Sequence, residues 1–253
     1  MELLKTEGVV LKRTKVGDND VILTIFSREK GLIQASVRGA RSLKSRMSAG
    51  SALFTYAEFV LKPGRTMYSV SSAEPKESFY QLATNIERLA FATYIADLTA
   101  FCVREEGGDE RLFSILLNTL YLFANSARDL RLVKCVYELK LLDCIGLAPE
   151  LSGCVRCGDV SEIDYLSPAE GGLLCRSCKR AEDMVRPLDE QSLIAMRYIL
   201  YSDDKRAFAF SAGEQVTKML EDHIEAFVRT HIDRDFYSLT YLNTILGKDE
   251  KLR

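Results

Sequence analysis

Four cysteines in the second half of the chain have the spacing of a metal site. They form two Cys-x-x-Cys pairs, Cys154 with Cys157 and Cys175 with Cys178, and seventeen residues separate the pairs. Each pair can place two sulfurs on one ion at about 2.3 Å, and four thiolates complete a tetrahedral zinc shell. A closed shell leaves no position for water or substrate, so the spacing predicts one structural Zn2+. Disulfide bonding is the alternative, and the chain has no secretory signature to favour it.

The segment between the two pairs is acidic. Residues 158–174 contain four Asp and Glu residues and no Lys or Arg. An acidic segment binds phosphate poorly, and only the flanking cations Arg156, Arg176, Lys179 and Arg180 leave a contact with DNA open. We therefore interpret the cysteine knuckle as a scaffold, because a metal site that forms on folding adds its binding energy to stability.

No catalytic constellation is present in the sequence. It contains neither a phosphate-binding GxxxxGK[ST] loop nor a GxSxG nucleophile motif. The two histidines, His223 and His231, fall near one apolar helical stripe, which favours packing over metal ligation or acid–base work. A zinc hydrolase would need an open coordination position, which four cysteines do not leave. The chain is therefore predicted to be a binding protein and not an enzyme.

The charge distribution points to a polyanion as the partner. Residues 1–80 hold 13 Lys and Arg against 8 Asp and Glu, whereas the rest holds 21 against 28. One nine-residue stretch, from Arg38 to Arg46, carries four cations and no acid, and further cations precede it near the end of the first strand. The candidate DNA-binding residues are Arg38, Arg41, Lys44, Arg46, Lys12, Arg13 and Lys15. A merely solvated loop is the alternative. Three aromatics, Tyr56, Phe59 and Tyr68, either stack on bases or belong to the core.

The predicted secondary structure changes from strands to helices near residue 78. Short β-prone runs are expected at 9–11, 21–26, 32–38, 53–62 and 66–71. Five strands in this length predict a small barrel of the OB type, although an SH3-like barrel would have a similar pattern. The predicted domains are an OB barrel (1–78), a first helical part (79–150), a four-cysteine zinc insertion (151–182) and closing helices (183–253). The fold class is therefore α+β and multidomain, with a helical bundle after the barrel.

Helix starts are indicated by capping patterns. Capping boxes occur at Thr84–Glu87 and Ser211–Glu214, and a single cap is expected at Asp109. Further helices are expected to start near Asp129 and at Pro187 and Asp189. Gly146 is expected to end the helix that begins at 129, and 239–246 is expected to form a short closing helix. Residues 112–124 are apolar nearly all round, which predicts a central helix.

The composition favours the cytoplasm. The sequence contains no apolar run of about 18 residues and no signal-peptide core, so no membrane association is expected. Of seven cysteines, four have zinc spacing, which indicates a reducing compartment. Cys102, Cys135 and Cys144 are expected to be buried apolar residues.

Several segments together resemble the RecO family of bacterial recombination mediators. They are Thr6–Leu11, Asp18–Phe26, Gly31, Arg38–Arg41 with Lys44–Arg46, and, around the zinc segment, Tyr165–Pro168, Gly171–Gly172 and Cys175–Cys178. The similarity covers the chain in order, from barrel to closing helices. One departure is Ser42, where family members often have a second basic residue, and this weakens the expected DNA contact locally.

The resemblance implies a function without catalytic turnover. A RecO protein binds single- and double-stranded DNA, anneals complementary strands, contacts the C-terminal tail of the single-stranded-DNA-binding protein SSB, and works with RecR to load RecA. It also implies a cytoplasmic, nucleoid-associated protein. Carried over to this chain, the DNA role falls on Arg38 and Arg41 first and then on Lys44 and Arg46. The alternative hypothesis is an interaction scaffold whose barrel binds a protein.

Overall fold

The computed structural model describes residues 2–40, 47–103, 105 and 107–248. They form two compact units. Unit 1 comprises residues 1–126 and 236–253, and unit 2 comprises residues 127–235. These two units do not test the four predicted domain ranges, because the units are defined by contacts within the fold and the ranges by patterns in the sequence. The ranges therefore stay a prediction.

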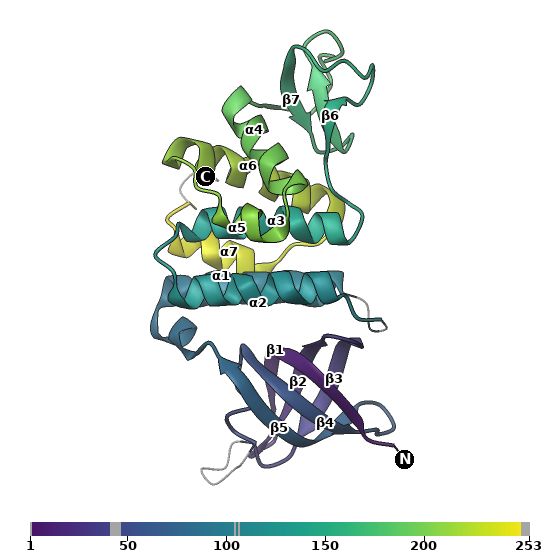
Figure 1. Cartoon of the computed structure of the whole chain (residues 1–253), viewed down its shortest axis with the longest axis vertical. Coiled ribbons are helices and arrows are strands. Elements are labelled where there is room, and N and C mark those ends of the chain that lie inside the picture. Colours follow the sequence, from purple (N-terminus) through teal and green to yellow (C-terminus); the bar gives the residue numbers. More distant parts are fainter. Residues whose placement is uncertain (1, 41–46, 104, 106, 249–253) are drawn as a thin grey trace. The chain divides into compact units, whose positions relative to one another are not determined.

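Unit 1 contains the predicted OB-type barrel. Its strands are β1 (Leu4–Val16), β2 (Asp20–Ser27), β3 (Gly31–Val37), β4 (Thr55–Lys62) and β5 (Tyr68–Ser78). They close in the order β1-β2-β3-β5-β4, and the β3–β5 pair is parallel while the others are antiparallel (Figure 1). In β4 every second residue is buried, and this alternation places Ala57, Phe59 and Leu61 in the barrel core. The fold prediction is confirmed for this part of the chain.

The first strand is much longer than the run at 9–11 that the sequence predicts. It pairs with β4 over Leu4–Val9 and with β2 as far as Val16, and a register shift between Val10 and Lys12 marks a bulge at Leu11. The three cations near the expected strand end therefore lie within β1 itself.

Three helices complete unit 1. They are α1 (Ile86–Cys102), α2 (Glu110–Asn125) and α7 (Tyr237–Ile245), and a 3-10 turn, η1 (Tyr80–Thr84), precedes α1. Phe236, just before α7, packs edge-on against Tyr94 and Phe101 of α1 at centroid distances of 6.1 and 5.9 Å. Phe113 of α2 contacts Phe26 of the barrel at 5.5 Å. The predicted closing helix is thus confirmed, and it returns to α1.

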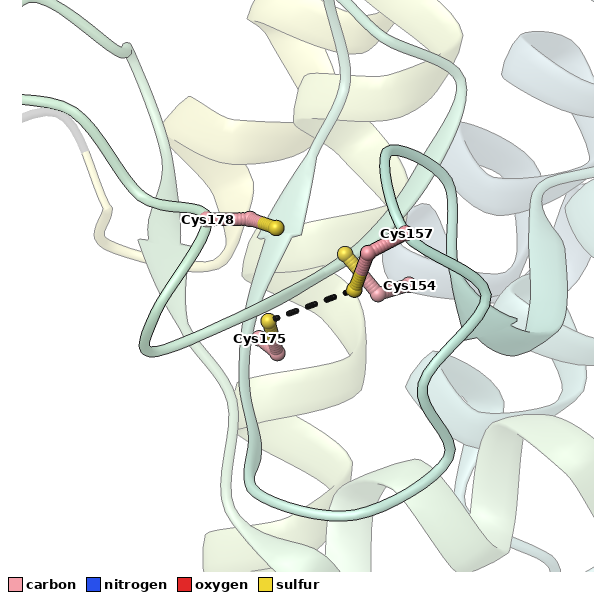
Figure 2. Close-up of side chains that lie close together, drawn as sticks. All are labelled: Cys154, Cys157, Cys175 and Cys178. Carbon is pink, nitrogen blue, oxygen red and sulfur yellow. Dashed lines mark hydrogen bonds between the residues drawn. The ribbon is translucent and has the colours of Figure 1, made fainter.

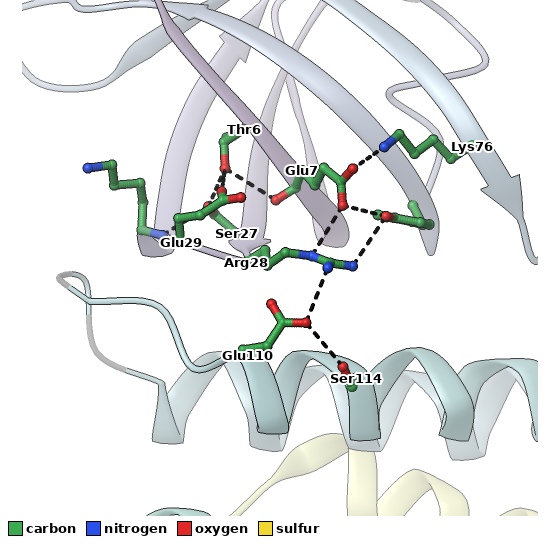
Figure 3. A network of polar contacts seen from close by, with 10 residues as sticks. Thr6, Glu7, Ser27, Arg28, Glu29, Lys76, Glu110 and Ser114 are labelled. Atoms are coloured by element: carbon green, nitrogen blue, oxygen red, sulfur yellow. Dashed lines mark hydrogen bonds and ion pairs between the residues drawn. The ribbon is translucent and has the colours of Figure 1, made fainter.

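One arginine joins the barrel to α2 through a polar network (Figure 3). Arg28 Nε lies 3.1 Å from a Glu7 carboxylate oxygen, and its Nη1 lies 3.1 Å from Glu110. Its guanidinium also lies 5.0 Å from the Phe113 ring centroid. Glu7 further accepts hydrogen bonds from Lys76 and from the Tyr56 hydroxyl, and these bonds, with the nearby Arg28 charge, lower the pKa of Glu7.

Replacing Glu7 by glutamine is expected to remove a pH-dependent part of unit 1 stability. A carboxyl with a depressed pKa stabilises the folded state fully above its ordinary value, here 4.5, and loses this contribution as the pH falls through the folded-state value. The free energy of unfolding of the wild type should therefore be larger than that of Glu7→Gln by about 1 kcal/mol near neutral pH. Urea unfolding between about pH 3 and pH 7 measures this difference, and a difference that stays constant in acid contradicts it.

Unit 2 combines helices with a small sheet. The helices are α3 (Leu130–Cys144), α4 (Glu190–Tyr201), α5 (Asp204–Ala209) and α6 (Glu214–Ile232). The strands β6 (Glu150–Cys154), β7 (Ile163–Ser167), β8 (Gly172–Cys175) and β9 (Arg186–Pro187) form a sheet in the order β6-β8-β7-β9. This sheet lies between α3 and α4 in sequence and carries the four cysteines, as predicted. None of the described helices has the length and apolar character needed to span a membrane.

Candidate functional site

The four cysteine sulfurs converge in unit 2 (Figure 2). All four Sγ atoms lie within 4.8 Å of one another, and Cys157 Sγ is 3.8 Å from Cys175 Sγ. Four sulfurs at about 2.3 Å from a common centre would be about 3.8 Å apart in a tetrahedron. The cluster therefore fits a single metal ion held by four thiolates.

Two matching strand ends bring the sulfurs together. Cys154 ends β6 and Cys175 ends β8, two strands that pair in parallel, and each Cys-x-x-Cys turn follows its strand. In the first turn, Gly158 donates its N–H to the Cys154 carbonyl at 2.7 Å with a φ of +77°, a conformation that favours glycine. In the second turn, the amides of Cys178 and Lys179 donate to the Cys175 carbonyl at 3.2 Å each. The local chain thus folds into two knuckles that face each other.

The backbone around Cys154 favours its thiolate form. Burial alone would raise the pKa of this thiol, but hydrogen bonds from the amides of Cys175, Arg156 and Cys157 outweigh that effect and lower the pKa to about 6. A thiolate is the form that binds a metal ion. The backbone of the first knuckle therefore favours the form of Cys154 that binds a metal ion.

Two of the four cations that flank the cysteines, Arg156 and Arg176, form ion pairs inside the ribbon, which we define as residues 150–187. The Arg156 guanidinium donates hydrogen bonds to the two carboxylate oxygens of Asp183 at 2.7 and 2.8 Å. It also donates to the Cys178 carbonyl oxygen at 2.5 Å and forms an ion pair with Glu170. This guanidinium lowers the pKa of Asp183 to about 2. Arg176 bonds Asp164 at 2.6 Å. These partners hold the two knuckles together and leave less positive charge for an outside ligand.

The histidines tie the ribbon to α6. His223 Nε2 lies 2.8 Å from the carbonyl oxygen of Pro187, and His231 Nε2 lies 2.8 Å from that of Pro168. His231 also stacks on Phe227 at 4.2 Å. The packing interpretation of both histidines is therefore confirmed. Sequence analysis did not identify their partners, which lie 36 and 63 residues away.

The structure places four of the seven DNA-binding candidates, and it distributes them over two faces. Lys12 pairs with Thr24, which contacts Gln34 on the outer face of the barrel, whereas Arg13 and Lys15 pair with the core residues Leu23 and Val21. Directly paired residues share a face of a sheet, so Arg13 and Lys15 point toward the barrel mouth and Lys12 points outward. Arg38 is exposed and directly follows β3. The remaining candidates, Arg41, Lys44 and Arg46, lie outside the described residues.

These four barrel cations have no ion-pair partner among the described residues. The ion pairs of the barrel involve other side chains, such as Lys5 with Glu58 and Arg28 with Glu7. Lys12, Arg13, Lys15 and Arg38 thus present charge that the described fold does not neutralise. In the ribbon, by contrast, two of the four flanking cations, Arg156 and Arg176, are paired with carboxylates, and Lys179 Nζ lies 5.4 Å from the Tyr165 ring centroid.

The three candidate stacking aromatics have different environments. Phe59 is fully buried in the barrel core, so the stacking alternative is wrong for this residue. The Tyr56 hydroxyl bonds Glu7 at 2.5 Å. Tyr68 is half-buried and lines a groove of about 700 Å³ together with Lys30, Gln34 and Arg65. Lys30, Gln34 and Arg65 are not among the residues that the sequence singled out, because only the folded barrel brings them together in one groove.

The chain is similar to known DNA repair proteins over almost its whole length. The family model described as "Recombination protein O N terminal" matches residues 1–79, and the one described as "Recombination protein O C terminal" matches residues 83–240. A DNA repair protein RecO from Acetivibrio thermocellus is 34% identical over 246 residues, which is 97% of this chain and 98% of the relative. A DNA repair protein RecO from Alkaliphilus metalliredigens is 35% identical over 239 residues, which is 94% of this chain and 97% of the relative. The matches include both the barrel and the ribbon-bearing part, in the same order.

Proposed function

This chain belongs to the RecO family of DNA repair proteins, and on that premise we propose that it is a non-catalytic recombination mediator that binds DNA through its barrel. It binds single- and double-stranded DNA and anneals complementary strands in the cytoplasm, at the nucleoid. With RecR it helps to load RecA on DNA that SSB covers. The four cysteines hold one structural Zn2+, since soft thiolates in tetrahedral geometry suit zinc.

The observation that carries this proposal is the difference between the two basic regions. The barrel cations Lys12, Arg13, Lys15 and Arg38 have no carboxylate partner among the described residues, whereas Arg156 and Arg176, two of the four cations that flank the cysteines of the ribbon, are paired. A cation without a partner gains most from phosphate, because it gives up no ion pair when it binds. The barrel is therefore the proposed DNA surface, and the ribbon is the proposed scaffold.

Charge reversal on the barrel is expected to abolish most DNA binding. Fluorescence anisotropy of a labelled oligonucleotide should give a log K that falls with log salt by about 0.7 per phosphate neutralised on a single strand. The wild type should show a slope worth several phosphates. Arg38→Glu/Arg41→Glu should lose at least about tenfold in affinity and should flatten the slope.

The matched control reverses two charges on the ribbon. Lys179→Glu/Arg180→Glu makes the same change in net charge, and it should leave affinity and slope nearly unchanged if the ribbon is a scaffold. Equal losses in both double variants would mean that overall charge and not the barrel surface governs binding. Weak, salt-insensitive binding by the wild type would overturn the DNA proposal.

The partner proposals rest on family membership. The acidic SSB tail with its apolar end needs a cation beside exposed apolar side chains. A groove of about 550 Å³ in unit 2 offers Arg186 and Arg229 beside Met184, although Asp222 and Glu225 also line it. This groove is our candidate for the SSB tail, while the contacts with RecR and RecA have no assigned surface.

One observation favours the alternative, an interaction scaffold whose barrel binds a protein. The groove beside Tyr68 is lined by two cations, Lys30 and Arg65, and by two carboxylates, Glu29 and Glu105. A groove without net charge suits a peptide better than a polyanion. Unchanged DNA affinity in Arg38→Glu/Arg41→Glu would favour this alternative.

A further inference from the structure

A carboxylate lies among the cations of the proposed DNA surface. Asp20 begins β2, where it is exposed, and directly precedes Val21. Lys15, Val21 and Val37 form one row across β1, β2 and β3, and Arg38 directly follows Val37. Since neighbouring strands lie about 4.8 Å apart, the backbone of Asp20 is within about 10 Å of the backbones of Lys15 and Arg38. A negative charge at this place repels phosphate, so Asp20 lowers DNA affinity unless it has another role.

The Asp20 carboxylate bonds the turn that carries Arg38. Its Oδ1 atom accepts a hydrogen bond from the Gly39 N–H at 2.9 Å. This N–H belongs to the peptide unit that joins Arg38 to Gly39, so the bond fixes the orientation of that planar unit and with it the backbone of Arg38. Gly39 has a φ of +62°. Glycine adopts both signs of φ readily, so the glycine alone does not select this conformation.

The chain on both sides of this turn is fixed by burial. Val37 is fully buried and Ala40 is 1% exposed, and both belong to the barrel core. Only Arg38 and Gly39 connect them, so the direction of Arg38 depends on the peptide unit that Asp20 bonds. Since Arg38 has no ion-pair partner among the described residues, the carboxylate holds the backbone of this arginine and leaves its guanidinium available for phosphate.

We propose that Asp20 is a positioning residue of the DNA surface, because its carboxylate fixes the peptide unit between Arg38 and Gly39 and thereby directs Arg38 toward phosphate. The proposal rests on the proposed function, since it assigns a role within the same surface. An acid that acts only through its charge weakens DNA binding, whereas an acid that positions a cation strengthens it. Removing the carboxylate therefore changes DNA affinity in opposite directions under the two interpretations.

Two substitutions at Asp20 separate charge from position. Asp20→Asn removes the charge but keeps an oxygen that accepts the Gly39 N–H, and it should bind a labelled oligonucleotide up to about threefold more tightly than the wild type. Asp20→Ala removes both the charge and the acceptor. It should bind about fivefold more weakly than the wild type, with a salt slope shallower by about 0.7, the equivalent of one phosphate. Glu74→Ala, at an exposed position of β5, is the matched control for charge and should not weaken binding.

Gly39 tests the same bond without a change of charge. A Cβ atom added to this residue meets no atom within 4 Å, so the cost of a substitution comes from the positive φ. Asparagine enters the left-handed conformation far more readily than a β-branched residue. Gly39→Asn should therefore cost less than about twofold in DNA affinity, and Gly39→Val about fivefold. Asp20→Ala/Gly39→Val should lose no more than the larger of the two single losses, because both changes remove one bond.

Hydrogen exchange in the free protein measures the bond itself. The Gly39 amide should exchange at least about fivefold faster in Asp20→Ala than in the wild type, while the amides of β2 and β3 keep their protection. If the wild type binds DNA with a steep salt slope and Asp20→Ala binds as tightly as Asp20→Asn, this proposal is overturned and the DNA proposal stands. Equal losses of affinity in both Asp20 variants overturn it as well. Weak, salt-insensitive binding by the wild type overturns both proposals.

Discussion

Replacing Lys134 by methionine is expected to destabilise unit 2 by about 3–5 kcal/mol. The Lys134 Nζ atom lies 2.8 Å from Glu225, 3.2 Å from Glu138 and 4.0 Å from Glu221. The side chains of Lys134, Glu138 and Glu221 are fully buried, and that of Glu225 is 13% exposed. Methionine fills similar space but leaves three carboxylates without their central cation.

The titration behaviour of the cluster supports this expectation. Burial alone would lower the pKa of Lys134, but Glu138 and Glu225 outweigh burial and raise it above the ordinary value for lysine. Lys134 is therefore charged at neutral pH, and the carboxylates that surround it depend on that charge. Removing one partner of a buried ionic group costs more than the group as a whole contributes, because the remaining charges stay desolvated.

Urea unfolding with hydrogen exchange on α3 and α6 peptides measures the loss and assigns it to unit 2. Arg206→Met is the matched control, since Arg206 pairs with Asp203 at 3.1 Å on the surface and should cost less than about 0.5 kcal/mol. Adding Glu138→Gln and Glu225→Gln to Lys134→Met should recover part of the loss. A loss below about 1 kcal/mol would mean that the acids take up protons or water without penalty.

This cluster is also where the sequence was least informative. Lys134 and Glu138 have the i, i+4 spacing of an exposed helical pair, and a further partner, Glu225 on α6, lies 91 residues after Lys134. Local apolarity favoured residues 112–124 as the central helix, but Tyr121 in that helix is 53% exposed. In α3, by contrast, every residue from Leu132 to Leu142 is buried. Burial of a charged helix depends on distant counter-charges that no local pattern reveals.

Helix starts show which local signals suffice. Asp109, Asp129 and Asp189 cap α2, α3 and α4 through their side chains, because a carboxylate beside free amides needs no distant partner. The sequence predicted the cap at Asp109 and helix starts near Asp129 and Asp189. The predicted capping box at Thr84–Glu87 was wrong. The Thr84 hydroxyl donates to the Gln81 carbonyl within η1 at 2.8 Å, and Asn85 caps α1 through the Arg88 amide.

The box at Ser211 was also misplaced. The helix α6 begins at Glu214 with Gly213 as its N-cap, and no side chain caps it. The metal site, in contrast to these two capping boxes, was predicted correctly as a cluster of four cysteines. Both Cys-x-x-Cys turns are local, and their spacing alone predicted that the sulfurs converge. The bonds from Arg156 to Glu170 and Asp183 were not predictable, because they depend on how the two knuckles pair.

Loss of the metal site is expected to unfold the ribbon and to leave DNA binding intact. If the cysteines hold zinc as proposed, Cys154→Ala should reduce bound zinc from about one per chain to near zero, since three thiolates bind zinc far more weakly than four. The apolar cluster at the metal site consists of Cys154, Leu174 and Cys175, with a few half-buried neighbours, and the other buried apolar residues of the ribbon are Leu151, Leu166 and Leu173. So few buried side chains cannot by themselves offset the conformational entropy of about forty residues, and structural zinc contributes on the order of 10 kcal/mol.

Metal analysis and hydrogen exchange over residues 150–187 measure the two effects together. Cys144→Ala is the control, because Cys144 ends α3 outside the cluster and its loss should leave the zinc content at about one. If the ribbon is only a scaffold, Cys154→Ala should bind the labelled oligonucleotide within about twofold of the wild type and with the same salt slope. A shallower slope would place the ribbon on the DNA. A ribbon that keeps its protection without metal would instead show that Arg156, Asp183 and Glu170 hold the two knuckles on their own.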